Sequence, residues 1–524
     1  MTPQARMELL GRMVGAPVAQ VARETPLERA ELLSDALERE VLLKREDLQP
    51  VFSFKLRGAY NRMSRLSDEE RARGVVAASA GNHAQGVALA ANRLGMSAII
   101  VMPVTTPAIK VDAVRRLGAE VVLQGDAFDE AGRHAEEIRR AGGRVFIHPF
   151  DDLDVIAGQG TVALEILRQA QVAPDAVFVP VGGGGLLAGV AVAIKCLSPQ
   201  TRVIGVEPVE AASFKAALAA GKPVDIGPVS LFADGVAVRK VGQHPFDIAH
   251  DLVDEIITVT SDEICASVGE LFLDTRSVAE PAGALAAAGL RRYVEAGGAG
   301  QRLAAIVSGA NIGFERIAHV VERAEVGAGH EVLFAAAIPE RPGSFLEFCR
   351  SIGNRPITEF NYRCSSMEHA QVFVGVRLAD GRRARGPLFE QLRRAGYPVE
   401  DLTDNSLARE HLRHMVGGHC PVAAREVLYR FRFPERPGAL ERFLTELAGR
   451  WSISLFHYRN HGADYGRVLA GFLVPAAEQH EFQRFLARTG YPWEPVADVA
   501  AQWFLGTSTT APRPARLASQ RQAG

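Results

Sequence analysis

Between about residues 40 and 310, short continuous apolar runs alternate with segments of helical periodicity. Continuous apolar runs are typical of strands that are buried on both faces, and helices between such strands indicate βαβ units. The expected strands are REVLLKRED, GVVAAS, SAIIVMPV, AEVVLQG, RVFIHPF, AVFVPV, TRVIGVEP and LAAIVS. The alternation predicts an α/β domain with a parallel sheet covered on both faces. In such a domain the loops that bind ligands lie at the carboxyl ends of the strands.

The chain beyond about residue 330 follows a different pattern, and this pattern occurs twice. Both copies carry the segment PERPG, which starts at Pro339 and again at Pro434, and both later reach a Gly-Tyr-Pro. Each copy predicts a strand, a turn, a helix, two strands, a helix and a strand, which is the order of a ferredoxin-like βαββαβ module. We therefore expect a tandem pair of small domains after the first domain. The expected regions are a first domain at 1–325, small domains at 331–405 and 426–500, and a disordered tail at 507–524.

The overall composition argues against several classes of function. Hydrophobic residues form 47% and charged residues 23% of the 524 positions, so the chain can bury a large core. A formal net charge of −2 gives no basic excess for binding nucleic acid or an anionic membrane surface. The five cysteines are scattered and form no CxxC pair, so neither a disulfide framework nor a metal site is predicted, and reduced thiols favour the cytoplasm. Neither a secretory signal nor an apolar run of membrane-spanning length is evident.

The strongest single motif is VPVGGGGLLAG, in which four glycines, 182–185, follow an expected strand and precede an expected helix. Without Cβ atoms their backbone can wrap closely around an anion, and the N–H groups and the helix N-terminus then form a phosphate cradle. The segment lacks the Lys and Ser/Thr of the GxxxxGK[ST] loop and the spacing of GxGxxG, which disfavours ATP, GTP and dinucleotides. A flexible turn is the alternative.

Three further segments carry groups that suit the same kind of site. In SAGNHAQG, small residues expose backbone donors and Asn82 adds an amide, which suits a carboxylate or a ring hydroxyl. In SFKLRGAYN, Lys55 lies next to aromatic residues, whose desolvating effect helps an amine to lose its proton, as a Schiff-base lysine must; a solvated surface amine is the alternative. In SGAN, Ser308 follows an expected strand and either faces the ligand crevice or caps a turn. Together the four motifs describe a site for pyridoxal phosphate and an amino acid.

The four motifs stand in the order and spacing of the fold-type II pyridoxal phosphate enzymes, which this chain resembles. The C-terminal repeat is similar to the paired regulatory module of the long, biosynthetic threonine dehydratases, and the resemblance covers about residues 15–506. It implies a catalytic domain with the tryptophan synthase β-like fold and a tandem pair of ferredoxin-like, ACT-like regulatory domains. One departure is SGANIGFERI, where Ile312 and Gly313 replace the more usual Val-Asn; it lies beyond Ser308 and leaves the cofactor roles unaffected.

The resemblance also implies a role for each matched residue. Lys55 forms the Schiff base with the cofactor, and Phe54 packs near the cofactor ring. Asn82 bonds the ring hydroxyl, and Ser308 bonds the pyridine nitrogen. The cofactor phosphate is bound by the backbone N–H groups of Gly182, Gly183, Gly184, Gly185 and Leu186. The loop expected to hold the substrate carboxylate contains Ser79, Gly81 and His83.

The activity that the resemblance implies is the loss of water and then ammonia from L-threonine to give 2-oxobutanoate, the first step of isoleucine biosynthesis, with L-serine as a secondary substrate. Isoleucine is the implied inhibitor, bound in the C-terminal repeat near Gly438, Leu440 and Leu444, with valine as a candidate antagonist. A homotetramer is implied as well.

Two other classes of function stay open at this point. One is another enzyme of the same fold, such as a serine dehydratase, a racemase or a cysteine synthase, against which the tandem repeat argues. The other is a non-enzymatic amino-acid sensor or an RNA-binding module, since βαββαβ folds also bind RNA. The repeat lacks an RNP-like aromatic signature and the chain lacks a basic excess, which disfavours RNA.

Overall fold

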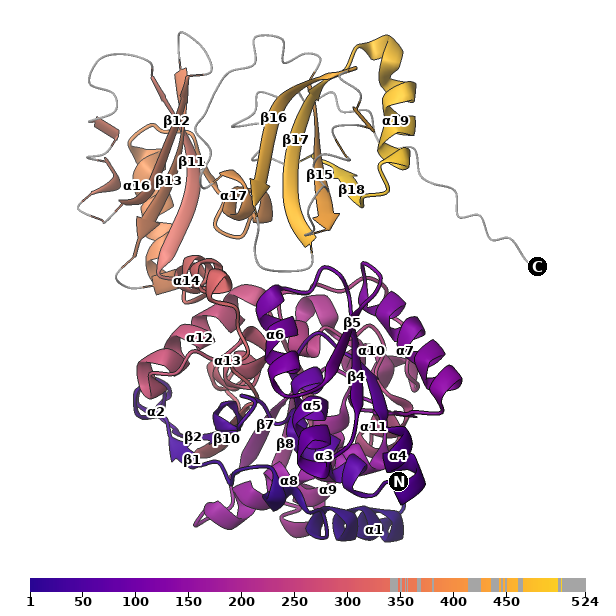
Figure 1. Cartoon of the computed structure of the whole chain (residues 1–524). Coiled ribbons are helices and arrows are strands. Elements are labelled where there is room, and N and C mark those ends of the chain that lie inside the picture. Colours follow the sequence, from indigo (N-terminus) through magenta and orange to yellow (C-terminus); the bar gives the residue numbers. More distant parts are fainter. Residues whose placement is uncertain are drawn as a thin grey trace. The chain divides into compact units, whose positions relative to one another are not determined.

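The computed structural model describes residues 1–339, 347–348, 351–353, 355, 357–364, 369–378, 381–412, 426–434, 443, 446–447, 450–459, 465–497 and 501. The chain divides into two compact units between Ala328 and Gly329 (Figure 1). The expected tail at 507–524 lies outside the described residues, as do the expected effector residues Gly438, Leu440 and Leu444.

The strands within residues 1–328 form two sheets. One has the order β1-β2-β10-β7-β8-β9 and is parallel except for the antiparallel pair β1 and β2; the other has the order β5-β4-β3-β6 and is parallel throughout. The strands are β1 (Leu27–Arg29), β2 (Glu40–Arg45), β3 (Val75–Ala78), β4 (Ala98–Met102), β5 (Glu120–Leu123), β6 (Val145–Phe146), β7 (Ala176–Pro180), β8 (Arg202–Pro208), β9 (Glu255–Val259) and β10 (Arg302–Val307).

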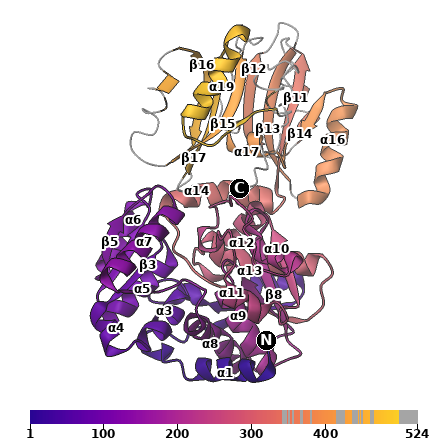
Figure 2. The same ribbon diagram turned by 90° about the vertical axis from the view of Figure 1, so that its right-hand side faces the viewer.

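Helices occupy most of the chain between these strands. They are α1 (Pro3–Val14), α2 (Glu31–Leu37), α3 (Lys55–Ser64), α4 (Asp68–Arg73), α5 (Asn82–Leu94), α6 (Ala108–Arg116), α7 (Phe128–Gly142), α8 (Leu153–Gln169), α9 (Gly185–Leu197), α10 (Ser213–Ala220), α11 (Gln243–Ala249), α12 (Ser261–Thr275), α13 (Pro281–Glu295) and α14 (Phe314–Gly327). Figure 2 shows the block of β3 to β5 with α5 to α7 on one side of the unit and the block of β8 with α9 to α13 on the other.

The strand β7 shows why apolar runs rather than alternating ones build the larger sheet. Val177 and Val179 point into a core formed with α8 and α9, whereas Ala176 and Phe178 point into a second core formed with α12 and α13. Every residue of the strand is buried. A strand covered by helices on both faces has no position at which a polar side chain reaches water, so both of its faces must be apolar.

The structure confirms the α/β architecture but distributes the expected strands over two sheets rather than one. RVFIHPF forms only the two-residue strand β6, at an edge of the smaller sheet. The strand β9 was not expected; it is an edge strand with exposed and buried positions, so it lacks a continuous apolar run. The helix α5 begins at Asn82, within SAGNHAQG, so Asn82 and His83 lie on its first turn.

The second unit contains two antiparallel four-stranded sheets, one for each copy of the repeat. Their orders are β12-β13-β11-β14 and β16-β17-β15-β18, with the first and third strands of each copy in the centre. This is the arrangement of a ferredoxin-like fold, as expected. The elements are β11 (Glu331–Pro339), β12 (Ile357–Cys364), β13 (His369–Arg377), α16 (Arg385–Arg394), β14 (Val399–Asp401), α17 (Ser406–Glu410), β15 (Glu426–Pro434), β16 (Ser452–Arg459), β17 (Tyr465–Leu473), α19 (Gln479–Arg488) and β18 (Trp493–Pro495).

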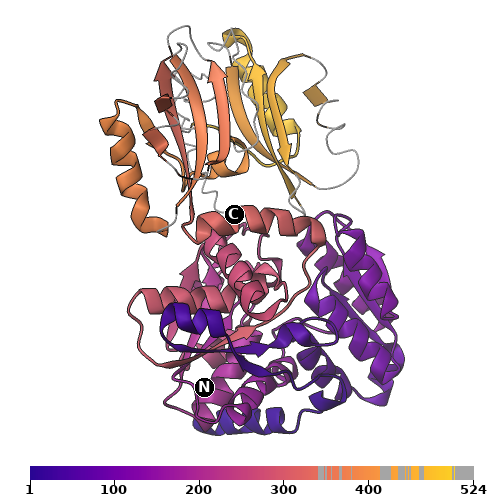
Figure 3. The same ribbon diagram turned by 90° about the vertical axis from the view of Figure 1, so that its left-hand side faces the viewer.

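The two sheets of the second unit share an apolar cluster. Along β11, Phe334 packs into the core of its own copy, whereas Leu333 joins Leu428 of β15 and Leu469 of β17. The helices α16 and α19 lie on the outer faces (Figure 1), and Figure 3 shows the two sheets side by side. The central strand of each copy thus contributes apolar residues to the core of its own copy and to the cluster shared with the other copy.

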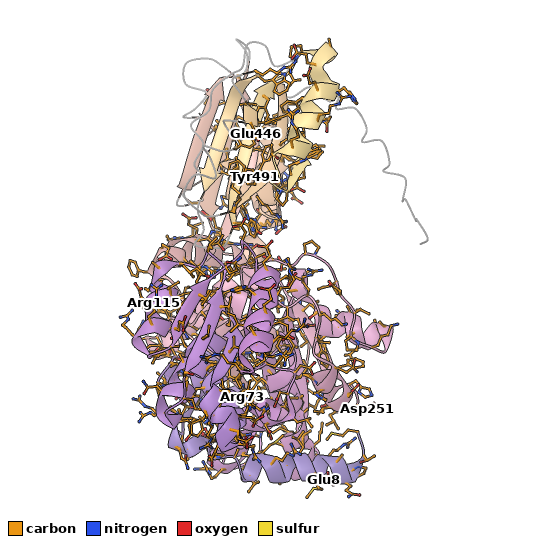
Figure 4. The ribbon with its side chains drawn as sticks, turned by 45° about the vertical axis from the view of Figure 1, so that its right-hand side comes forward. Glu8, Arg73, Arg115, Asp251, Glu446 and Tyr491 are labelled. Atoms are coloured by element: carbon orange, nitrogen blue, oxygen red, sulfur yellow. The ribbon has the colours of Figure 1, made fainter. Side chains whose placement is uncertain are left out.

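Charged side chains of both signs cover the first unit. Glu8, Arg73, Arg115 and Asp251 are all exposed and lie at its exterior (Figure 4). Among the described residues, none of the helices combines the length and the apolar character needed to cross a lipid bilayer.

Candidate active site

Three of the four candidate motifs begin where a strand of a parallel sheet ends. Ser79 directly follows β3, Ser308 directly follows β10, and Gly182 comes two residues after β7. The strands β7 and β10 are parallel neighbours, so their carboxyl ends lie at the same edge of the larger sheet. This is the edge at which open α/β sheets bind ligands.

Lys55, in the fourth motif, is the first residue of α3, and its side chain is half-buried. Its Nζ donates to Pro149 O over 3.2 Å and lies 5.3 Å from the centre of the buried Phe54 ring. It forms no ion pair with any residue that the structure describes. Burial lowers the pKa of Lys55 to about 8, although the charge of Glu280 acts in the opposite direction. The amine is therefore able to lose its proton near neutral pH, as a nucleophile must.

The backbone just before Lys55 pairs with the backbone that carries Ser308. Phe54 N donates to Ser308 O over 3.3 Å, and Ala310 N donates to Phe52 O over 2.9 Å. Phe52 adopts a φ of 56°, a strained conformation for a residue with a side chain. Segments that are far apart in the sequence are thus tied together, and they bring the amine and the Ser308 hydroxyl into one site.

Ser308 itself is buried, and its Oγ donates to Ala282 O over 3.1 Å. The contact places this hydroxyl beside the first turn of α13. No charged group takes part in it, so Ser308 presents a neutral hydroxyl to the site.

The glycine tetrad leads into α9 and has no room for side chains. Gly184 has a φ of 91°, in the region that favours glycine, and α9 begins at the next residue, Gly185. A Cβ atom on Gly183 would lie 2.2 Å from the ring of Phe150, and one on Gly182 would lie 2.9 Å from the Cα atom of Val236. No side chain caps the first turn of α9, which also contains the buried Leu186. Its first N–H groups therefore remain available to an anion.

The loop 149–151 joins the amine to the glycine tetrad, and no motif in the sequence points to this role. Pro149 accepts the hydrogen bond from Lys55, and the ring of the next residue, Phe150, packs against Gly183. Asp151 then accepts hydrogen bonds from the backbone of residues 243 and 244. The amine and the anion cradle are thereby parts of a single site.

The SAGNHAQG loop contributes an open backbone and two buried side chains. A Cβ on Gly81 would meet nothing within 4 Å, and Gly81 N donates to Ser79 Oγ over 3.2 Å. His83 Nε2 donates to Ile147 O over 2.8 Å, while its buried Nδ1 has no hydrogen-bond partner among the described residues. Burial, and secondarily the charge of Lys55, lowers the pKa of His83 to about 3, so the ring is neutral. The His83 ring therefore brings no positive charge to a carboxylate in this loop.

Glu280 is a site residue that the sequence reasoning missed. It precedes α13, where an acidic residue reads as an ordinary helix cap, yet its side chain makes no capping hydrogen bond. Instead its Oε1 accepts from Asn82 Nδ2 over 2.6 Å. Burial and the charge of Asp234 raise the pKa of Glu280 above its ordinary value.

The crowding at Gly183 gives a testable consequence. We expect Gly183→Ala to lower the unfolding free energy by roughly 1–3 kcal/mol, because overpacking of a filled site forces its neighbours to move. Binding of an anion at the α9 N-terminus should weaken as well. Gly132→Ala in α7 is a matched control, since a Cβ there meets nothing within 4 Å. Thermal unfolding of both variants checks the prediction, and equal unfolding temperatures would contradict it.

Comparison with known families and proteins accounts for both units. The family described as "Pyridoxal-phosphate dependent enzyme" matches residues 18–309, and the one described as "C-terminal regulatory domain of Threonine dehydratase" matches residues 322–412 and 418–501. The biosynthetic L-threonine dehydratase of Burkholderia multivorans is 50% identical over 96% of this chain and 100% of its own length. The corresponding protein of Escherichia coli is 53% identical over 92% of this chain and 94% of its own.

A solved structure agrees with these similarities. The processed form of threonine deaminase isoform 2 from Solanum lycopersicum superposes with a TM-score of 0.61 at 49% identity, over 62% of this chain and 90% of that one. Together with the family matches over both units, this establishes that the chain belongs to the biosynthetic threonine dehydratases, a family of pyridoxal-phosphate dependent enzymes with a C-terminal regulatory domain.

Proposed function

We propose that the chain is a threonine ammonia-lyase that converts L-threonine into 2-oxobutanoate and ammonia, with L-serine as a secondary substrate. The observation that carries the proposal is the environment of Lys55. Its half-buried amine has a pKa lowered to about 8 and donates to the carbonyl that precedes Phe150, the ring packed on the glycine tetrad. The site fits pyridoxal phosphate, because the amine suits its aldehyde and the N–H groups at α9 suit its phosphate.

Bound pyridoxal phosphate supplies an electron sink for the pair left when the Cα–H bond of the amino acid breaks. The residues of the chain supply positioning and proton transfer. Lys55 Nζ removes the Cα proton as a general base, which its lowered pKa permits. The neutral hydroxyl of Ser308 brings no negative charge to the ring nitrogen, which favours rapid elimination over a long-lived carbanion.

The remaining site residues bind and orient. We assign the phosphate to the N–H groups of residues 182–186 and the ring hydroxyl to the Asn82 amide. The substrate carboxylate is assigned to the loop that contains Ser79, Gly81 and His83, where a Cβ on Gly81 would meet nothing within 4 Å. The domain bounds proposed for this arrangement are 1–325 for catalysis and 331–405 and 426–500 for regulation.

A product assay tests the proposal directly. The purified chain with added pyridoxal phosphate should form 2-oxobutanoate from L-threonine faster than it forms pyruvate from L-serine. Chiral analysis of the remaining serine separates this activity from that of a racemase of the same fold. Turnover of serine to its mirror image without release of a 2-oxo acid would overturn the proposal.

The lowered pKa of Lys55 predicts how cofactor loading depends on pH. Only the neutral amine attacks an aldehyde, and with a pKa of about 8 roughly one amine in ten is neutral at pH 7. We expect the rate at which added pyridoxal phosphate gains its visible absorbance to rise about tenfold from pH 7 to 9 and then to level off. A rate that still climbs severalfold between pH 9 and pH 10 would indicate an ordinary, solvated lysine.

For the second unit we propose feedback inhibition by isoleucine, with valine as its antagonist and Gly438, Leu440 and Leu444 as candidate contacts. The match of this unit to the regulatory domain of threonine dehydratases supports the proposal. Such regulation requires isoleucine to bind one conformational state better than another. Threonine saturation curves should therefore shift with isoleucine and shift back with valine, and curves that do not respond to isoleucine would remove the proposal.

We also propose a cytoplasmic homotetramer. The free thiols of Cys196 and Cys265 are consistent with a reducing compartment. Sedimentation of the purified chain measures the assembly, and a monomer at working concentration would exclude the tetramer.

A further inference from the structure

The amide of Asn82 is held from two sides by residues from distant parts of the chain. Its Nδ2 donates to Glu280 Oε1 over 2.6 Å, and its Oδ1 accepts from Asn311 Nδ2 over 2.6 Å. Asn82 and Glu280 are buried, and Asn311 is half-buried. Asn82 begins α5, Glu280 precedes α13, and Asn311 follows β10, so three separate elements meet at this amide.

The hydrogen bonds determine which way the Asn82 amide faces. Asn311 Nδ2 also donates to Val51 O over 2.8 Å, and a carbonyl oxygen can only accept, so the NH₂ end of Asn311 is fixed. That NH₂ faces Asn82, which must present its oxygen there. A reversed Asn82 amide would set two NH₂ groups against each other and its oxygen against the Glu280 carboxylate. One N–H of Asn82 is thereby bonded to Glu280, and the second has no acceptor among the described residues.

Glu280 is not placed as a structural cap would be. It stands at the cap position of α13 without bonding the helix's own N–H groups, and its carboxylate is packed tightly, since a Cβ on Gly309 would lie 2.5 Å from Oε1. Burying a carboxylate costs free energy that a single amide hydrogen bond offsets only in part. Because the Glu280 side chain bonds the Asn82 amide and makes no capping hydrogen bond to α13, we infer that Glu280 acts by holding that amide.

We propose that Glu280 and Asn311 are positioning residues, which fix the Asn82 amide so that its second N–H stays available to the ring hydroxyl of pyridoxal phosphate. The inference rests on the proposed function, because that function gives Asn82 its ring-hydroxyl role. It assigns a role to two residues that bond Asn82 rather than the cofactor, and that determine whether Asn82 can donate to the ring hydroxyl. Removal of either partner frees the amide to rotate, and the ring hydroxyl then loses a fixed donor.

The test is a cycle of protein variants and cofactor analogues. The full chain, freed of cofactor, is titrated with pyridoxal phosphate and with 3-deoxypyridoxal phosphate, which lacks only the ring hydroxyl. In the unaltered chain, loss of the hydroxyl should weaken binding by about tenfold, the effect of one hydrogen bond. In Glu280→Met, which removes the acceptor at similar length, pyridoxal phosphate should bind about tenfold more weakly and the two ligands should become equal. Glu280→Gln keeps an acceptor oxygen and should restore most of the difference.

The possible outcomes separate this inference from the function on which it rests. If Glu280→Met weakens both ligands by the same factor, its role is structural and the inference is wrong. If the unaltered chain does not bind pyridoxal phosphate, the proposed function fails and the inference with it. Asn311→Ala removes the donor on the other side of the amide, and it serves as the second variant if Glu280→Met does not fold. In that variant, too, the ring hydroxyl must lose its contribution to binding.

Discussion

Replacement of Lys55 by alanine should lower kcat with threonine by at least about a thousandfold, because one side chain supplies both the covalent anchor and the general base. The same variant should lose the visible absorbance of the bound cofactor, while the glycine cradle still holds the phosphate. Stopped-time assays of 2-oxobutanoate and an absorbance spectrum measure the two effects.

Two further lysine variants make the result specific. Lys222 is exposed just after α10, and Lys222→Ala should retain full activity and the full spectrum. Lys55→Arg keeps a positive charge but has no amine that loses its proton near neutral pH, so it should be as inactive as Lys55→Ala. Retained turnover and absorbance in Lys55→Ala would overturn the assignment of the site.

The second large effect is expected at Arg57, in the first turn of the helix that carries Lys55. Its fully buried guanidinium donates to Glu46 Oε2 over 2.8 Å and to Glu165 Oε1 over 2.6 Å. Lys44, also fully buried, donates to Glu165 Oε2 over 2.6 Å. Two acids and two bases thus balance each other inside the protein. The two carboxylates draw the pKa of Arg57 upward against the effect of burial.

Arg57→Met should lower the unfolding free energy of the first unit by roughly 3–5 kcal/mol, because it leaves one buried carboxylate without compensation. Arg62→Met is the matched control on the same helix. Its guanidinium pairs with Asp152 over 3.0 Å with both side chains partly exposed, and we expect a loss of less than about 1 kcal/mol. Denaturant unfolding of the two variants makes the comparison, and equal losses would show that the buried network contributes little.

The sequence predicted the elements of the first unit well where they are buried on both faces. Runs such as AVFVPV are typical of strands that are covered on both faces, and this one forms β7 as expected. The division into two sheets was not predicted, because strand pairing depends on contacts between distant residues that an apolar run does not encode. The edge strand β9 was missed for the related reason that its partial exposure breaks the run.

For the site, the motifs with unusual composition were informative and the ordinary residues were not. Four consecutive glycines and a lysine beside aromatic rings stand out in a sequence, and the structure places both around the Pro149–Phe150 loop. Glu280 and Arg57 carry no such signal, because an acidic helix cap and an arginine in a helix are common. Their importance depends on burial and on partners, which only the fold reveals.

The place of β10 between β2 and β7 has a consequence for the order in which the protein folds. The strands β2 and β7 are not hydrogen-bonded to each other. The larger sheet therefore stays in two parts until β10, residues 302–307, pairs with both of them. Ser308 and its pairing partner before Lys55 meet only at that step. A nascent chain that ends before β10 would therefore lack Ser308 and the pairing that holds the backbone before Lys55, and cofactor capture should mark the completion of the first unit rather than guide its start.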